Sequence, residues 1–243
     1  MNNSALIADG ISNDETNDLF GLNLFYEAAD ASIKNSPDFS GNVSAIRWSS
    51  NQGKSIEKER AHRFLYDPMD RLRAAEMLNN RSGWLLNSAS REEGITYDLN
   101  GNLLTIRRTD ENGNTQDQLR YLYGTASDYG NKLLSIQDSG DPLSGFQDVQ
   151  ASVDYTYNLA GSLTADRNAK ISGIEYNQIN LPAIITDEQG NRQKNYYDAG
   201  GKKLRSEFYS SAGQLSKATD FSGALVYELG SLNRFEHERS EEH

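Results

Sequence analysis

Acidic side chains are the residues of this chain whose type best suits catalysis, because paired carboxylates carry out glycoside hydrolysis. The sequence has 35 Asp and Glu residues, and Asp98, Asp154, Asp198 and Glu228 stand where strands are expected to end. Aspartate is also the usual residue at such positions, since its carboxylate accepts backbone N–H groups and begins a turn. A folding role therefore explains these four residues better than a hydrolase site does.

Metal binding and nucleophilic catalysis find little support in the sequence. The three histidines, His62, His237 and His243, lack the spacing of a ligand motif, and no Gly-x-Ser-x-Gly element is present. Residues 110–114 are similar to a calcium loop, but Gly113 comes too early in it and Tyr121 stands where the bidentate Glu should be. We expect a hairpin turn there, and no catalytic residue, metal or cofactor in the chain.

The composition favours a thin β-structure with much surface. Only 36% of the residues are hydrophobic and the mean hydropathy is −0.73, yet the chain has 13 Tyr, 8 Phe and 2 Trp, which a disordered chain would lack. A net charge of −11 argues against a nucleic-acid partner. The absence of cysteine excludes disulfides and thiolate chemistry.

Targeting signals are not evident in the sequence. The first nine residues have no basic start and no long apolar run, so we expect no signal peptide and no membrane-spanning segment. Residues 1–18 are predicted to be a polar lead-in loop, and the charged tail 236–243 is predicted to fray.

One short motif recurs: Tyr, then Asp or Asn, then a turn, then Leu. We call it the Tyr-Asx motif and number its copies first to fifth: residues 66–72, 97–103, 157–163, 176–181 and 197–204. A weaker copy with an insert runs from Tyr123 to Leu133. Such repetition predicts a chain built from one unit used many times.

Folding alone can explain every residue of the motif. Tyr is expected to end one strand, the Asx side chain to accept backbone N–H groups, Gly or Asn to adopt a left-handed conformation, and Leu to open the next strand on the packed face. The residues assigned this structural role are Tyr66, Asp67, Leu72, Tyr97, Asp98, Gly101, Leu103, Tyr157, Asn158, Gly161, Leu163, Tyr176, Asn177, Leu181, Tyr197, Asp198, Gly201 and Leu204.

Alternation of side chains predicts hairpins, with strands at 103–108 and 119–123, 183–186 and 193–197, and 203–209 and 214–221. In the last pair we expect Leu204, Ser206 and Phe208 on a dry face and Lys203, Arg205 and Glu207 on a wet one. Asn112-Gly113 suits a turn with positive φ at both central residues. Residues 70–78 could compete as a helix, but a strand is favoured.

With five copies, the motif resembles the YD repeat of bacterial RHS proteins, of the related shell subunits of insecticidal toxin complexes, and of animal teneurins. The resemblance extends from about Asp18 to Phe235, so residues 19–235 are predicted to be the YD-repeat β region. It is supported by residues 19–22 followed by 40–48, which look like a repeat entering a strand that closes on Trp48, and by 221–228, which resemble the strand after the last repeats.

The resemblance implies an all-β fold in which antiparallel hairpins add to one another as a curved or spiralling sheet and form a hollow shell. It implies no catalytic role for the repeats. In such proteins the shell encloses a variable C-terminal segment, often a toxin, or contacts sugars or proteins. The implied location is extracellular or in the bacterial cell envelope.

The chain departs from the family pattern in its self-cleavage motif. The family's Asp-Pro-x-Gly-Leu is approached only by residues 67–72, which lack the Gly and lie early, within a repeat. Self-cleavage and a toxin payload are therefore not expected in this chain. Because about six units are too few to close a shell, we expect a partial shell whose partner is the remainder of a longer RHS chain, a toxin segment, or a surface glycan or protein.

Two functional hypotheses follow, and a third is weaker. The first is a non-enzymatic structural module of an RHS-type shell, for encapsulation or for cell-surface contact. The second is an adhesion surface for carbohydrate or protein, for which exposed rings could serve. The third is a glycosidase-like hydrolase. The rings considered are Tyr121, Tyr123, Tyr155, Tyr157, Tyr196, Tyr197, Trp48 and Trp84.

Overall fold

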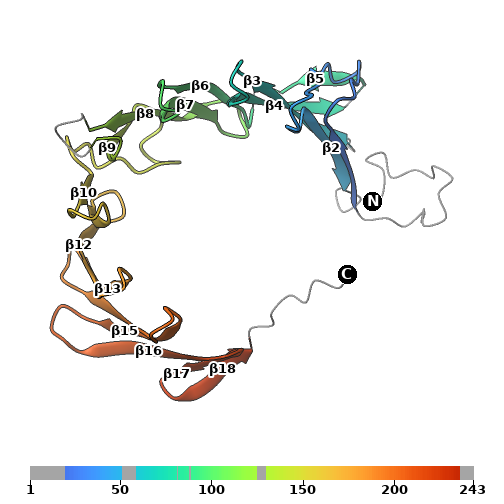
Figure 1. Cartoon of the computed structure of the whole chain (residues 1–243). Coiled ribbons are helices and arrows are strands. Elements are labelled where there is room, and N and C mark those ends of the chain that lie inside the picture. The colour runs from blue at the N-terminus through green and yellow to red at the C-terminus, as the bar shows by residue number, and fades with distance from the viewer. Residues whose placement is uncertain (1–19, 51–58, 81, 88, 125–129, 236–243) are drawn as a thin grey trace. The chain divides into compact units, whose positions relative to one another are not determined.

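The computed structural model describes residues 20–50, 59–80, 82–87, 89–124 and 130–235. All of their regular secondary structure is β-strand, in two antiparallel sheets of nine strands each (Figure 1). The predicted all-β fold of repeated antiparallel hairpins is therefore confirmed. The predicted lead-in loop and the charged tail lie outside the described residues. In the described part of the chain, no helix could span a membrane.

The first sheet has the strand order β1-β2-β3-β4-β6-β7-β8-β9, and the short β5 pairs with β4 beside this path. Apart from β4 and β6, neighbours in the order follow one another along the chain, as expected where short connections join antiparallel strands. The strands are β1 (Phe20–Phe25), β2 (Ala45–Ser50), β3 (Glu59–Tyr66), β4 (Leu72–Asn80), β5 (Trp84–Leu86), β6 (Glu92–Tyr97), β7 (Leu103–Thr109), β8 (Thr115–Tyr123) and β9 (Leu133–Asp138).

The second sheet is a simple meander in the order β10 to β18. Its strands are β10 (Tyr155–Tyr157), β11 (Leu163–Asp166), β12 (Ile171–Tyr176), β13 (Pro182–Asp187), β14 (Arg192–Tyr197), β15 (Lys203–Tyr209), β16 (Leu215–Ser222), β17 (Leu225–Glu228) and β18 (Ser231–Phe235).

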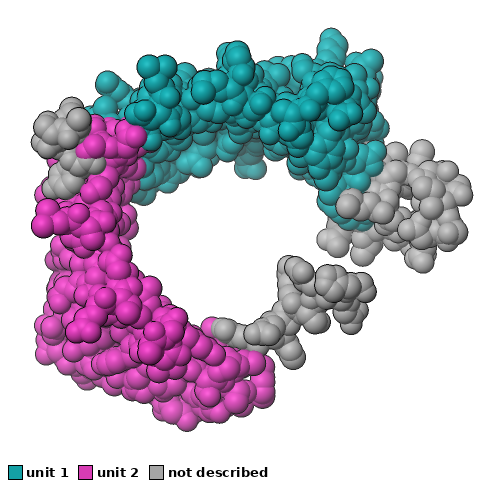
Figure 2. Space-filling model, in the orientation of Figure 1, with its two compact units in different colours: residues 1–122, 136–147 teal, residues 123–135, 148–243 magenta. Residues whose placement is uncertain are grey.

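The chain divides into two compact units (Figure 2). The first unit comprises residues 1–122 and 136–147, and the second comprises 123–135 and 148–243. The first unit contains an apolar cluster of Ile33, Ala45, Ala61 and Leu78, against which Phe25 and Trp84 pack. In the described part of the second unit, only Ala218 and Val226 are buried hydrophobic residues.

For residues 70–78, the strand interpretation is confirmed over the helical one from Leu72 onward, where β4 begins. The predicted turn geometry at Asn112-Gly113 is wrong. Gly113 has a φ of 85°, whereas Asn112 is not among the described residues with positive φ. The reason is that the turn is a five-residue one, begun by Asp110, in which a single residue takes the left-handed conformation.

The predicted dry and wet faces of β15 are confirmed for Ser206, which is buried, and for Lys203, which is exposed, but they are wrong for Leu204, Phe208 and Glu207. Glu207 is buried, with 9% of its surface exposed, whereas Leu204 and Phe208 are 43% and 36% exposed. The Glu207 carboxylate accepts hydrogen bonds from the hydroxyls of Tyr196 (2.7 Å) and Tyr209 (2.8 Å). These bonds, together with the one from Arg205, lower the pKa of Glu207. A polar network thus buries Glu207 on the face that is predicted to be wet.

Candidate structural site: the Tyr-Asx motif

The second motif shows how the turn is built. The backbone N–H of Asp98 donates to the carbonyl of Asn102 (2.9 Å), and the N–H of Gly101 donates to the carbonyl of Asp98 (3.2 Å). Gly101 has a φ of 87°, and the strand register shifts next to Tyr97. This is a type I turn followed by a left-handed residue and a bulge, a common hairpin connection that matches the twist of the strands.

The Asx side chain holds this turn closed. Oδ1 of Asp98 accepts the backbone N–H groups of Asn100 and Asn102, both at 2.8 Å. Oδ2 accepts the side-chain amide of Asn102, also at 2.8 Å. The Asn102 side-chain bond and the backbone bonds together lower the pKa of Asp98, because they favour the charged carboxylate.

The other motifs repeat this arrangement with different residues. Asp67 and Arg71 form the corresponding side-chain pair in the first motif, with Nε to Oδ2 at 2.8 Å. Asn177 accepts the backbone N–H groups of Ile179 (3.1 Å) and Leu181 (2.9 Å) in the fourth. The left-handed residues, with their φ values, are Asp70 (61°), Gly101 (87°), Gly161 (87°), Asn180 (58°) and Gly201 (84°).

The tyrosine of every motif links its hairpin to the preceding one. Each tyrosine hydroxyl donates to a backbone carbonyl at or next to the motif's Leu position one repeat earlier, a contact that we call the tyrosine staple. The pairs are Tyr66 to Val43 (2.8 Å), Tyr97 to Leu72 (2.8 Å), Tyr157 to Leu133 (2.8 Å), Tyr176 to Leu163 (2.7 Å) and Tyr197 to Pro182 (3.1 Å). A local sequence motif thereby makes a contact between repeats.

The staple tyrosines are half-buried rather than fully buried. Burial raises the pKa of the hydroxyls of Tyr66, Tyr157 and Tyr197, which therefore remain protonated donors at neutral pH. Leu72, Leu103, Leu163 and Leu181 are also half-buried, but Leu204 is exposed. The predicted packed-face role of the motif leucine thus does not extend to the fifth copy.

Basic side chains cover some of the tyrosine rings. The guanidinium of Arg71, in the first motif, lies 4.6 Å from the ring centre of Tyr97 and donates to the carbonyl of Asp98 at 3.2 Å. In the second unit, Nζ of Lys132 lies 5.4 Å from the ring centre of Tyr157. Both cations stand just before a motif's Leu position and contact the next tyrosine, so they add a second link between repeats.

A further copy of the turn precedes β2. Oδ1 of Asp38 accepts the N–H groups of Ser40 (2.9 Å) and Asn42 (3.2 Å), and Gly41 has a φ of 99°. Pro37 stands where the motif has Tyr, so a search for tyrosine misses this copy. The signal that could have found it is Asp-x-x-Gly-Asn, which recurs at residues 98–102.

Turns at the other ends of the strands use the same geometry. We call the ends that carry the motif turns the motif rim, and the other ends the opposite rim. On the opposite rim, the turns beginning at Asp110, Asp187 and Ser210 close with the same pair of backbone hydrogen bonds. The predicted hairpin turn at 110–114 is therefore confirmed. The turn is thus common to both rims, whereas the staples belong to the motif rim.

Asp117 is a structural residue that the sequence did not reveal. Its side chain is fully buried, pairs with Nε of Arg108 at 2.8 Å and accepts the backbone N–H of Phe146 at 2.6 Å. Gly145 lies so close that an added Cβ would be 2.2 Å from a carboxylate oxygen of Asp117. This carboxylate fixes the loop after β9, far along the sequence, and so leaves no local signal.

The carboxylates considered for catalysis serve local structure where their contacts are described. Asp98 and Asp198 accept N–H groups of their own turns, and Glu228 pairs with Lys217 at 2.8 Å. Asp154 is buried, with 1% exposed.

Among the residues that the structure describes, no group of His, Asp and Glu side chains is arranged to hold a metal ion. His62 stacks edge-on against Trp48, and its burial lowers its pKa.

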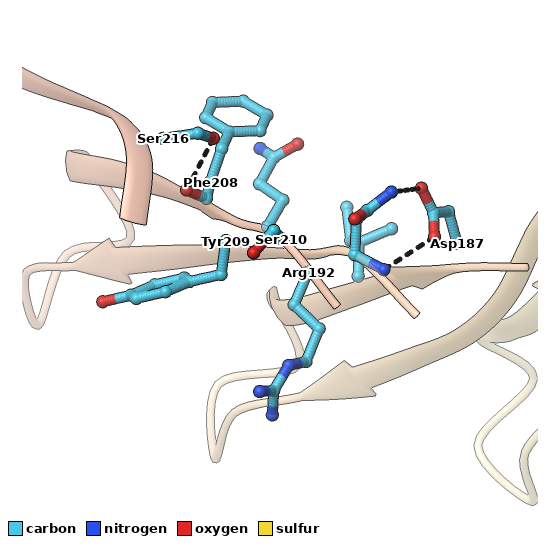
Figure 3. A pocket seen from close by; sticks show the side chains of 9 residues that line it. Asp187, Arg192, Phe208, Tyr209, Ser210 and Ser216 are labelled. Atoms are coloured by element: carbon cyan, nitrogen blue, oxygen red, sulfur yellow. Dashed lines mark hydrogen bonds between the residues drawn. The ribbon is translucent and has the colours of Figure 1, made fainter. Parts of the chain in front are cut away.

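A shallow groove of about 480 Å³ lies between the opposite-rim turns of the second unit. Figure 3 shows that the Phe208 ring and the Arg192 side chain point away from each other, on different sides of the strands. Asp187 in this groove is engaged by Asn191, whose Nδ2 donates to it at 2.8 Å. The lining side chains thus do not converge on one point, as the groups of an active site would.

The rings considered for carbohydrate binding are mostly half-buried, and Tyr196 is the exposed one, at 45%. Its hydroxyl is engaged by Glu207. Arg47 covers one ring face of Trp84, with a distance of 5.2 Å from the guanidinium to the ring centre.

Comparison with known protein families and with curated protein sequences finds no match. Similar solved structures include the TcdB2-TccC3 crystal structure, with a TM-score of 0.37 and 9% identity over 85% of this chain and 10% of that chain. The Photorhabdus luminescens Tc holotoxin pore has a TM-score of 0.30 and 15% identity, over 77% of this chain and 9% of that one. The chain spans about a tenth of the length of these structures. With TM-scores below 0.5, these similarities assign neither a family nor a function.

Proposed function

We propose that the chain is a non-enzymatic structural module, part of an RHS-type shell that encloses a polypeptide or makes contact at a cell surface. The tyrosine staple is the observation that carries the proposal. Five motif tyrosines each fix one hairpin to the hairpin before it. A sheet extended in this way suits a wall, and the YD-type resemblance of the motif supplies the class of shell and an extracellular or envelope location.

The use of the polar groups supports a structural rather than a catalytic role. Active sites hold titratable groups ready for a substrate, often with strongly perturbed pKa values in a cleft. In the motifs, the carboxylates of Asp67 and Asp98 instead bind N–H groups of their own turns. Their lowered pKa values stabilise turns that stand at the ends of strands.

Encapsulation is tested with a reporter joined after His243. The reporter is a short unfolded polypeptide with protease sites, and its cleavage rate is compared with that of the same reporter joined to an unrelated compact β-domain. We expect slower cleavage behind this chain, because even a partial wall shields the reporter from one side. Replacing the staple tyrosines Tyr97, Tyr157 and Tyr176 by Ala should restore fast cleavage, because the wall would lose its links.

Equal cleavage behind the two carriers would contradict encapsulation. Surface contact is then tested directly by adding the fluorescently labelled chain to whole bacterial and animal cells. Absence of binding to both cell types would leave neither part of the proposed function standing.

A carbohydrate-binding surface is the second candidate, and the exposed ring of Tyr196 favours it. A glycan array probed with the chain and with Tyr196→Ala tests it. Binding that the substitution abolishes would support this function, and silence of the whole array would count against it.

A further inference from the structure

Four of the five motif turns, and the turn at Asp38, carry a large apolar side chain that is exposed at the tip. In the first unit these are Phe39, Met69 and Leu99, which are 78%, 65% and 100% exposed. The opposite-rim turns that begin at Asp110 and Asp187 carry Glu111 and Glu188 instead, although Leu143 and Leu229 are exposed elsewhere on that rim. A turn that only connects two strands has no need of an exposed apolar tip, and clustered exposed apolar side chains often mark an interaction site.

The three tips of the first unit form a row because their turns are tied together. The Tyr66 hydroxyl bonds to Val43, at the end of the turn that carries Phe39. The guanidinium of Arg71, in the turn of Met69, bonds to the carbonyl of Asp98, which precedes Leu99. Consecutive motif turns are two strands apart, so their tips should recur about every 9.6 Å along the rim.

Negative charge accompanies this row. The three turns, residues 38–42, 67–71 and 98–102, contain four carboxylates and one guanidinium, a net charge of 1 − 4 = −3. Hydrogen bonds from Ser40, Arg71 and Asn102 lower the pKa values of Asp38, Asp67 and Asp98 respectively, so the negative charge is kept over a wide pH range.

The second unit has apolar tips without this charge. Leu159 and Ile179 are 109% and 49% exposed. Their turns, residues 158–162 and 177–181, begin with asparagine and carry no charge, and the turn 198–202 balances Asp198 with Lys202. The chain therefore holds a neutral version of the same rim, which serves as an internal control.

The spacing between the apolar tips indicates the conformation of a partner. A polyproline II segment presents every third side chain on one face, at about 9.3 Å intervals. In a β-strand, side chains on one face recur about every 6.7 Å, which is shorter than the spacing of the tips. Sheet twist turns successive tips by roughly 45°, which a short extended peptide can follow over three contacts.

We propose that the motif rim of the first unit binds an extended, cationic polypeptide whose apolar side chains recur at every third residue. Apolar side chains of the partner would pack between Phe39, Met69 and Leu99, and its cations would face the carboxylates of the three turns. The overall charge of −11 favours the same class of partner. This interaction would go beyond the architectural role and does not depend on it.

The probe is a fluorescein-labelled peptide of four Leu-Pro-Lys units, titrated into the full chain and followed by fluorescence anisotropy. A second peptide of the same composition has all its leucines at one end. We expect saturable binding of the periodic peptide and binding at least about tenfold weaker for the other, because a misplaced apolar side chain loses its burial. Added salt should weaken the binding.

Substitutions assign the site. The triple variant Phe39→Ser, Met69→Ser, Leu99→Ser should weaken binding at least about tenfold. The control triple Leu85→Ser, Leu86→Ser, Leu143→Ser removes other exposed apolar side chains of the same unit and should leave binding unchanged. The double variant Leu159→Ser, Ile179→Ser, on the motif rim of the second unit, should also leave binding unchanged. The circular dichroism spectrum confirms that each variant is folded.

Three results would overturn the proposal. One is absence of binding, or equal binding of the two peptides. Another is self-association in analytical ultracentrifugation that the rim triple abolishes, which would make a second copy the occupant. The third is flotation with phosphatidylcholine vesicles that the rim triple abolishes, which would make a lipid surface the occupant.

Discussion

The two units are built from the same motif, but they are stabilised differently. The first unit has an apolar cluster around the fully buried Ile33, whereas the described part of the second unit buries only Ala218 and Val226 among its hydrophobic residues. Both nevertheless form sheets whose hairpins are joined by staples, such as Tyr97 to Leu72 in the first and Tyr176 to Leu163 in the second. The comparison indicates that the motif orders a sheet where little apolar core is present.

The two tryptophans give a convenient way to follow the units separately. Trp48 and Trp84 both lie in the first unit, so tryptophan fluorescence reports on that unit, whereas far-ultraviolet circular dichroism reports on both. Urea denaturation followed by the two signals can therefore locate the effect of a substitution.

The largest effect is expected from the core of the first unit. Ile33→Ala should lower the free energy of unfolding of this unit by about 3 kcal/mol, because a fully buried side chain leaves a cavity. The control is Ile179→Ala in the second unit, where the side chain is 49% exposed and the cost should be below about 0.5 kcal/mol. Similar losses for the two variants would show that burial of Ile33 does not stabilise the first unit.

In the second unit, the staples should contribute more to the free energy of unfolding than the few buried apolar side chains do. Tyr176→Ala removes a half-buried ring and the hydrogen bond to Leu163, and we expect it to cost about 2 kcal/mol. The change should appear in the urea transition seen by circular dichroism and not in the one seen by tryptophan fluorescence. Tyr26→Ala, which alters a 41% exposed tyrosine outside the motifs, is the control and should have little effect.

The turns themselves should contribute equally on the two rims. Asn177→Ala on the motif rim and Ser210→Ala on the opposite rim each remove a side chain that accepts a turn N–H. Each should cost about 1 kcal/mol, as loss of a comparable helix cap does. A much larger loss at one rim, measured by thermal denaturation, would mean that the turns are not equivalent.

The smallest expected effect is a difference between the motif turns of the two units in how much stability they lose in acid. Hydrogen bonds from Asn102 and the backbone lower the folded-state pKa of Asp98, so this stabilisation is present above the unfolded pKa of about 4 and is lost as the pH falls through the folded pKa. Asn158 and Asn177 at the same position in the second unit do not titrate.

Asp98→Asn should therefore keep the turn, as asparagine does in the third and fourth motifs, and reduce the loss of stability of the first unit in acid. Urea midpoints from tryptophan fluorescence, measured between about pH 5 and pH 3, test this. Unchanged acid sensitivity would show that the Asp98 carboxylate does not contribute to it.

The sequence predicted the strands better than their faces. The bounds of β15 agree with the prediction of 203–209, and the strand predicted within 70–78 is observed as β4 at 72–80, because alternation and turn residues are local signals. The face of Glu207 in β15 is predicted wrongly, since the hydroxyl groups of Tyr196 and Tyr209 bind its carboxylate.

The motif residues could be identified from sequence, but their most informative contact could not. The acceptor of each staple is a backbone carbonyl, such as that of Leu72 for Tyr97, and a carbonyl leaves no mark in the choice of amino acid. The turn at Asp38 was obscured because Pro37 replaces the tyrosine. The role of Asp117 depends on Phe146, which is distant in the sequence.

The central claim is that the tyrosine hydroxyl transmits stability from one hairpin to the preceding one. Hydrogen–deuterium exchange with Tyr176→Phe and Asn177→Ala tests it most directly. The Tyr176 side chain bonds to the preceding hairpin, whereas the Asn177 side chain bonds within its own turn. We predict that Tyr176→Phe accelerates exchange in its own hairpin and also around Leu163, in the preceding one, whereas Asn177→Ala accelerates it only in the turn 177–181. Unchanged exchange around Leu163 in Tyr176→Phe would contradict the account.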